Sequence, residues 1–174
     1  MSKIKQKIIK LLAAYPEREF YAQEIAGKVN CSKASAVIIL QDLADKKIVH
    51  KDKRGHMKFY KINQENIEVK KFKIELALQK LNQPLPRLKK ISSKIILFGS
   101  ASRGEQTFDS DIDLLILTND KENVRGVLQK FKPKLGLKPI IKTPSEWSEV
   151  EVRDPEFYRE VKSGITLHNY VSRV

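Results

Sequence analysis

The sequence has few of the residues and runs that mark secreted or membrane proteins. One cysteine, Cys31, in 174 residues excludes an internal disulfide framework and a cysteine-based zinc site. Its three histidines lack metal-ligand spacing. The longest apolar runs, residues 36–40 and 95–98, are far shorter than the ~18 residues of a membrane span. The N-terminal lysines recur at helical spacing with no cleavage site, so we expect a cytoplasmic protein without a membrane partner.

Positive charge is abundant and unevenly distributed. The net charge is +13. Residues 1–90 hold 21 basic and 9 acidic side chains, whereas residues 91–174 hold 13 and 12. A basic half favours a polyanionic partner, because each Lys or Arg that neutralises a phosphate releases counterions. A solvated, lysine-rich surface is the alternative interpretation.

The first third of the chain has the pattern of three short helices and a hairpin. Apolar residues recur every three or four positions over residues 4–15 and 22–29 and again in a helix that Ser32 can cap. Residues 48–52 and 57–62 then alternate apolar and polar side chains around a basic turn with Gly55, which predicts two strands.

This order of elements resembles a winged helix-turn-helix. The resemblance implies that the helix from Ser32 lies in the major groove of double-stranded DNA. It also implies that the hairpin, or wing, contacts the flanking phosphates. The implied DNA-binding residues are Ser32, Lys33, Ser35, Lys51, Lys53, Arg54 and Lys58, with His56 also on the wing.

The middle of the third helix departs from this pattern. Val37, Ile38 and Ile39 follow one another where many such helices expose an arginine or glutamine. We therefore expect an exposed isoleucine, which weakens direct base readout. A protein-interaction role, including contact with a second copy of the chain, stays open.

We predict three regions along the chain. Residues 1–64 form the winged helix and residues 65–83 a connecting helix with a broad apolar surface. Two prolines, Pro84 and Pro86, mark the start of a second domain at residues 84–174.

Residues 94–117, KIILFGSASRGEQTFDSDIDLLIL, carry the chemistry. An apolar strand leads into a Gly99-Ser100 turn, after which residues 101–104 begin a helix whose N–H groups suit phosphate. Asp111 and Asp113 start a second strand, and a period of two puts both carboxylates on one face. Such a pair suits Mg²⁺, which prefers one or two carboxylates together with substrate phosphates. The alternative interpretation is a purely structural one, in which nearby Arg or Lys side chains stabilise the two aspartates at the strand end.

The combined pattern of Gly-Ser, Arg-Gly and Ser-Asp-x-Asp resembles the minimal nucleotidyltransferases of the DNA polymerase beta superfamily. The resemblance implies transfer of a nucleoside monophosphate from a nucleoside triphosphate, usually ATP, to a hydroxyl acceptor. Asp111 and Asp113 would be catalytic and hold Mg²⁺ or Mn²⁺. Gly99, Ser100, Arg103, Gly104 and Ser110 would bind the nucleotide. The expected fold is α+β, with a winged helix-turn-helix followed by a small mixed α/β nucleotidyltransferase-like domain.

One family feature is missing. A third carboxylate is expected on the strand at residues 137–142, and Lys138 occupies its position. An ammonium there could pair with either aspartate and compete with the metal. Asp109, Glu105 and Asp120 are the candidate replacements.

The sequence is therefore compatible with two functions. In the first, the chain is a DNA-associated nucleotidyltransferase. In the second, it is a DNA-binding transcriptional regulator whose degenerate second domain binds a nucleotide or a partner without catalysis. A homodimer or a separate helical partner protein is compatible with both.

Overall fold

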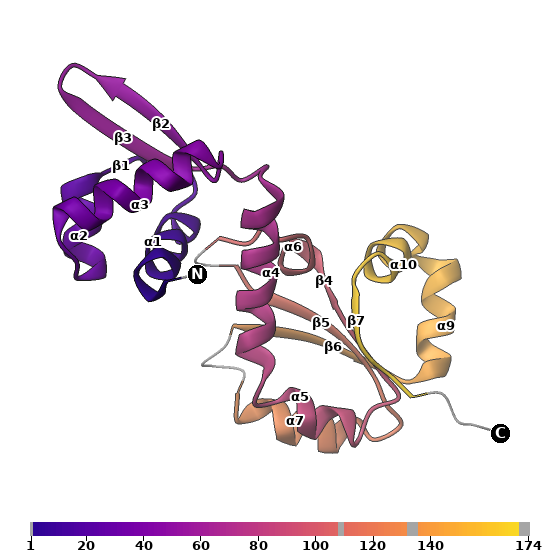
Figure 1. Ribbon diagram of the computed structural model, residues 1–174. Helices are drawn as coiled ribbons and strands as arrows, with labels where there is room; N and C mark the ends of the chain where they lie inside the picture. The colour runs from indigo at the N-terminus through magenta and orange to yellow at the C-terminus, as the bar shows by residue number, and fades with distance from the viewer. Residues whose placement is uncertain (1, 108–109, 132–135, 171–174) are drawn as a thin grey trace. The chain divides into compact units, whose positions relative to one another are not determined.

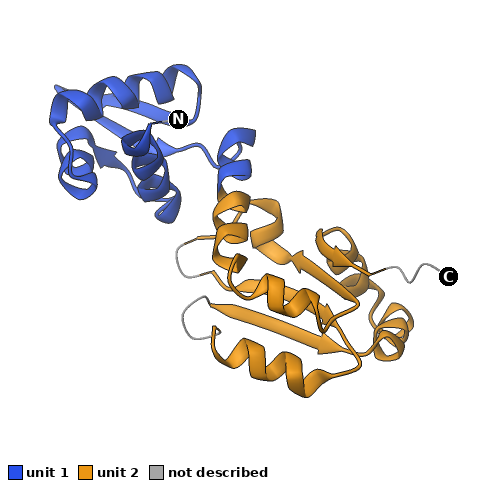
Figure 2. Cartoon of the chain, turned by 60° about the horizontal axis from the view of Figure 1, so that its bottom comes forward, with its two compact units in different colours: residues 1–72 blue, residues 73–174 orange. Residues whose placement is uncertain are grey.

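The computed structural model describes residues 2–107, 110–131 and 136–170 (Figure 1). The chain divides into two compact units, residues 1–72 and residues 73–174 (Figure 2). None of the described helices is both long and apolar enough to cross a membrane.

Unit 1 is a bundle of three helices against a small sheet. The helices are α1 (Lys3–Ala14), α2 (Ala22–Val29) and α3 (Lys33–Asp45). Asn30 ends α2 in the left-handed conformation, and Ser32 starts α3 by accepting a hydrogen bond from the Ser35 N–H at 3.1 Å. These two residues make the tight turn between the helices.

The sheet of unit 1 contains the wing. Its strands are β1 (Phe20–Tyr21), β2 (Val49–Arg54) and β3 (Met57–Ile62), in the antiparallel order β1-β3-β2. The wing is the hairpin of β2 and β3. The predicted hairpin is confirmed, whereas β1 was not predicted because two residues are too few to show a period. The unit has the predicted architecture of a winged helix-turn-helix.

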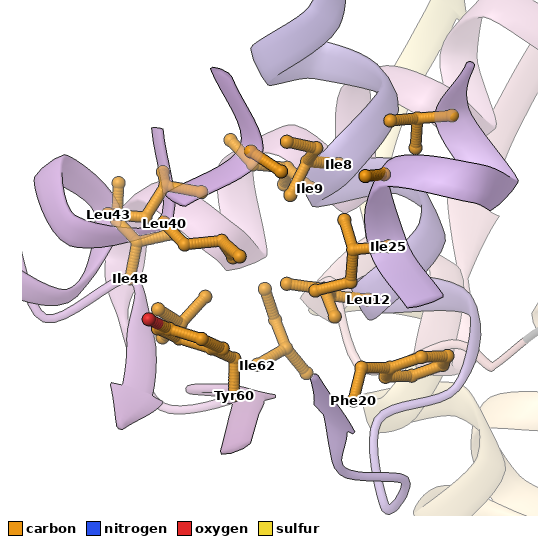
Figure 3. Close-up of a cluster of buried hydrophobic side chains, with 14 of the residues drawn as sticks. Ile8, Ile9, Leu12, Phe20, Ile25, Leu40, Leu43, Ile48, Tyr60 and Ile62 are labelled. Carbon is orange, nitrogen blue, oxygen red and sulfur yellow. The ribbon is translucent and has the colours of Figure 1, made fainter. Parts of the chain in front are cut away.

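The core of unit 1 draws on all of these elements. Figure 3 shows Ile8 and Leu12 of α1, Leu40 of α3, and Phe20 and Tyr60 of the sheet packed together. Each of these side chains is at most 1% exposed.

Helix α4 (Ile67–Leu81) contributes to two cores. Val69 and Phe72 pack in the cluster of unit 1, and Ala77 and Leu81 pack in a cluster of unit 2. The broad apolar surface of this segment follows from that double packing. Helix α5 (Leu85–Lys89) comes next, and its prolines stand at its start, where no backbone donor is lost.

Unit 2 is built on a mixed sheet of four strands. They are β4 (Lys94–Phe98), β5 (Ile112–Leu117), β6 (Leu137–Lys142) and β7 (Ile165–Asn169). The order is β6-β5-β4-β7, with β5 and β6 parallel and the other pairs antiparallel. This mixed sheet agrees with the predicted fold class.

Helices cover both faces of the sheet. They are α6 (Gly99–Arg103), α7 (Lys121–Gln129), α9 (Pro144–Arg153) and α10 (Pro155–Lys162), besides α4 and α5. Leu97 and Leu114 pack with α4, α5 and α7 on one face, and Phe98 and Leu115 pack with α9 and α10 on the other. Alternating strand residues therefore fill two separate layers.

Gly164 lies at the entry to β7. A Cβ atom at this position would lie 2.4 Å from the carbonyl oxygen of Leu97 and 3.0 Å from the Cβ of Phe98. The chain can pass from α10 into β7, beside β4, because residue 164 has no side chain.

Candidate active site and nucleic-acid interface

The two aspartates lie at the start of β5. Asp111 directly precedes the strand and is exposed, whereas Asp113 is the second strand residue and is half-buried. Both side chains are on the same face of the sheet because they are two residues apart. The structure therefore brings together the two carboxylates that the sequence predicts as a pair.

Gly99 lies against Asp113. Phe98 pairs with Asp113 across β4 and β5, so the next residue turns directly over the carboxylate. Gly99 has a φ of +67°, and a Cβ there would be 2.5 Å from Asp113 Oδ2. Glycine is required both by the backbone conformation and by the space.

The helix after the turn is shorter and earlier than expected. We predicted a helix that begins at residues 101–104, but α6 begins at Gly99 and ends at Arg103. Gly104 ends this helix in the left-handed conformation, with φ +71° and its N–H donating to the Ser100 carbonyl. Gly99 and Ser100 thus lie in the first turn of α6, and Gly104 is its C-cap.

The other predicted nucleotide-binding side chains are engaged within the protein. Ser110 Oγ accepts a hydrogen bond from the Thr107 N–H at 2.8 Å and braces the loop before β5. Arg103 Nε donates to Glu105 Oε2 at 2.8 Å, and Arg103 Nη1 lies 3.7 Å from Glu160 Oε1. Two carboxylates therefore hold the guanidinium.

Burial raises the pKa of Asp113 above its ordinary value. The positive charge of Lys138 acts against this shift, and the negative charges of Asp111 and Glu160 add to it. Among the described residues, none donates a hydrogen bond to the Asp113 carboxylate or forms an ion pair with it. A bound cation would offset the free-energy cost of burying the ionised carboxylate.

Lys138 lies beside Asp113, as the sequence predicts. The two residues are register partners in the parallel pair of β5 and β6, so their side chains are on one face. Lys138 is exposed and forms no ion pair within 4.0 Å with any described carboxylate. Its charge partly offsets the rise in the pKa of Asp113 that burial causes.

None of the proposed replacements is seen to complete the carboxylate set. Glu105 pairs with Arg103, and Asp120 caps α7 by accepting a hydrogen bond from the Asn123 N–H at 3.0 Å. Asp109 lies outside the described residues. Across residues 2–107, 110–131 and 136–170, no group of three or more His, Cys, Asp or Glu side chains is arranged to hold a metal.

Glu160 is the acid that sequence reasoning missed. It lies on α10, close enough to Arg103 for an ion pair and close enough to Asp113 to raise its pKa. No motif in the sequence connects it with the aspartates, because it comes to them only through the packing of α10 on the sheet.

The wing carries two cations without partners. Lys53 and Lys58 stand directly opposite each other in the β2–β3 pair, and both are exposed. Like charges in such a position repel. Neither forms an ion pair with any other described residue.

Lys51 and Arg54, the other two predicted DNA-binding residues of the wing, are paired. Arg54 donates two hydrogen bonds to Glu19, each at 2.7 Å, and a third to Asp52. Lys51 Nζ donates to Gln41 Oε1 of α3 at 2.7 Å. Glu19 and Asp52 therefore compete with a phosphate for the Arg54 guanidinium.

The start of α3 is polar and capped. Ser32 Oγ accepts the Ser35 N–H and donates to Ser35 Oγ at 2.9 Å, while Lys33 is exposed. These three predicted residues lie together at the first turn of the helix.

A family comparison identifies unit 2. A model of the nucleotidyltransferase domain matches residues 75–165, more than half of the chain. The chain belongs to the nucleotidyltransferase domain family. This family generally uses divalent metal ions. No curated protein matches the sequence.

Three solved structures are similar to parts of this nucleotidyltransferase-family chain. ZitR of Lactococcus lactis, as a C30AH42A mutant, is 17% identical with a TM-score of 0.40, covering 53% of this chain and 63% of its own. A proposed nucleotidyltransferase from Sulfolobus solfataricus is 20% identical with a TM-score of 0.36, covering 57% and 83%. The archaeal chromatin protein TrmBL2 is 13% identical with a TM-score of 0.35, covering 92% and 71%. This chain thus spans less than two thirds of ZitR, and none of the three TM-scores reaches 0.5.

Proposed function

We propose that this protein transfers a nucleoside monophosphate from a nucleoside triphosphate, ATP in the first instance, to a hydroxyl acceptor. The observation that carries the proposal is the half-buried Asp113 carboxylate, unpaired among the described residues and pressed against the Gly99 turn. A buried anion without a partner is costly, and a site that tolerates one is suited to a cation.

The residues at this site fit Mg²⁺ or Mn²⁺. Asp111 and Asp113 offer two carboxylates on one face, which suits a hard ion whose remaining ligands are phosphate oxygens and water. The ion would offset charge on the triphosphate as pyrophosphate leaves. Gly99 lets the turn lie against Asp113, and Ser100, the next residue, would offer its hydroxyl to the phosphates.

Ion binding and turnover can be tested separately. MnCl₂ with ATP should raise the melting temperature of the wild-type protein, and ATP with either ion should yield pyrophosphate and AMP, with water in place of the unidentified hydroxyl acceptor. Asp111→Asn and Asp113→Asn should abolish both effects. Glu149→Gln is the matched control, because Glu149 is an exposed acid that pairs with Arg153 on α9. If the wild type gives neither effect, the proposal is wrong.

Lys138 supports the second candidate, a regulator that binds nucleotide without turnover. Lys138 is the register partner of Asp113, at the position where the resemblance implies an acid. A thermal shift with ATP but no pyrophosphate in the wild type, and pyrophosphate release by Lys138→Asp, would favour this function.

DNA binding by unit 1 is proposed under both candidates. The supporting observation is the Lys53–Lys58 pair, two opposed cations that an anionic phosphate would stabilise. Affinity for a DNA duplex should fall steeply with salt. Lys53→Ala and Lys58→Ala should each weaken binding and reduce the salt slope, whereas Lys89→Ala, an exposed lysine of unit 2, should not. Equal affinities for all variants would contradict the assignment of the wing.

A further inference from the structure

The outward face of α3 is apolar where a DNA-reading helix is usually polar. Ala34, Val37, Ile38, Gln41 and Asp45 share this face at spacings of three and four residues. Ile38 is 71% exposed and Val37 is 37% exposed. The opposite face of α3 packs into the core of unit 1 and buries Ala36, Leu40 and Leu43. The core of unit 1 therefore does not require an apolar side chain at position 38.

The one amide on this face is already hydrogen-bonded. Gln41 Oε1 accepts from Lys51 Nζ at 2.7 Å, and Gln41 Nε2 donates to Asp45 Oδ1 at 2.7 Å. The five residues of the face include no Arg, Asn or Lys. The bidentate pairings that identify guanine or adenine are therefore not available at its centre.

Cations lie beside the apolar face and on the wing of the same unit. Lys33 lies at the start of α3, Lys51 beside Gln41, and Lys53 and Lys58 on the wing. An apolar strip in a unit that also carries exposed cations matches a groove that has methyl groups on its floor and phosphates on its walls. An apolar protein surface would leave these lysines without anionic partners.

We propose that Val37 and Ile38 read the C5-methyl groups of thymine in the major groove. This inference rests on the DNA binding proposed above. Thymine is the standard base that presents a methyl group there, and apolar side chains are its natural contacts. Ile38, the more exposed of the two, is the residue that determines the preference for thymine.

The experiment uses the full chain and duplexes that differ by the methyl group alone. The probes are poly(dA-dT) against poly(dA-dU), and poly(dG-dm⁵C) against poly(dG-dC), in competition fluorescence anisotropy. Burial of one methyl group is expected to favour binding about fourfold. The wild type should prefer the methylated polymer in both pairs.

Two variants separate methyl readout from phosphate contact. Ile38→Ala should bring the thymine-to-uracil ratio close to one while the salt slope is unchanged. Because Ile38 is exposed, this variant is expected to fold, and an unchanged melting temperature checks that it does. Lys53→Ala should weaken binding to every polymer and leave the ratio as it is.

The outcomes distinguish this inference from the DNA proposal. Salt-dependent binding with equal affinity for each methylated and unmethylated partner overturns methyl readout and leaves DNA binding in place. No binding to any duplex overturns both. Sedimentation provides a further check. If the wild type self-associates, Ile38→Ala makes it monomeric and the thymine-to-uracil ratio is unchanged, the face is a protein interface and the inference is wrong.

Discussion

The Asp113 carboxylate is partly buried and has no hydrogen-bond or ion-pair partner among the described residues, a combination that is costly for a charged group. Its position was predictable from the Asp-x-Asp spacing, because a strand period of two requires no knowledge of the fold. Its contact with Gly99 was not, because that contact depends on the pairing of Phe98 with Asp113.

We expect Asp113→Asn to stabilise unit 2 in the absence of metal and nucleotide. The raised pKa means that the folded state holds the proton more tightly than the unfolded state. The stability that this group contributes is therefore greatest below the unfolded pKa and is lost as pH rises through the folded pKa. Asparagine removes that loss, so the melting temperature at neutral pH should rise by about 1–2 °C, a small shift because solvent screens a half-exposed group.

The pH profile provides the check. The gap between Asp113→Asn and the wild type should close as pH falls below the ordinary range of an aspartate. A variant less stable than the wild type at neutral pH would show that the carboxylate has a stabilising partner in the free protein.

Gly99→Ala should be destabilising by about 2 kcal/mol, because alanine is strained at positive φ and its Cβ would meet the Asp113 carboxylate. Urea unfolding measures the loss. Gly126→Ala is the matched control, since position 126 lies within α7 with nothing within 4 Å of an added Cβ. It should be neutral or stabilising by up to about 1 kcal/mol. Equal effects at both sites would contradict the crowding at Gly99.

Helices and strands were predictable to different degrees. The helices of unit 1 and the wing strands follow from apolar spacing and from Ser32, Asn30 and Gly55. β1 was missed because it has two residues, and α6 was misplaced because its first residue is the turn glycine itself. Such short elements are fixed by their neighbours and leave no period in the sequence.

Helix α9 depends on a capping box. Thr143 Oγ1 accepts the Glu146 N–H at 3.2 Å, and Glu146 Oε2 accepts the Thr143 N–H at 2.8 Å. Thr143→Ala should cost unit 2 about 1 kcal/mol, measured by urea unfolding, because the Glu146 N–H loses its acceptor. Thr143→Ser keeps the hydroxyl and should retain most of the stability. If both variants lose the same amount, packing of the threonine methyl matters and the cap does not.

The chain as a whole has separate cores for its two units. The boundary falls inside α4, where the contributions pass from Val69 and Phe72 to Ala77 and Leu81. The sequence predicted an apolar helix at this place. It did not predict where along that helix one core ends, because the periodicity continues without a break.

Separate cores predict separate responses to cavities. Leu40→Ala in unit 1 and Leu97→Ala in unit 2 should each cost about 2–5 kcal/mol, because both side chains are 0% exposed. In scanning calorimetry, each variant should lower the melting temperature of its own unit and leave the other transition in place. A single transition that both variants shift equally would show that the two units unfold as one.

Gly164 is a position at which the fold, and not the candidate site, makes this chain intolerant of substitution. The contact of residue 164 with β4 leaves no room for even one carbon atom, so any substitution must push the last strand away from the sheet. In a saturation library selected for folded protein, every amino acid but glycine should disappear at codon 164. A survey of sequence variation would then mark this position as invariant, although it has no part in chemistry.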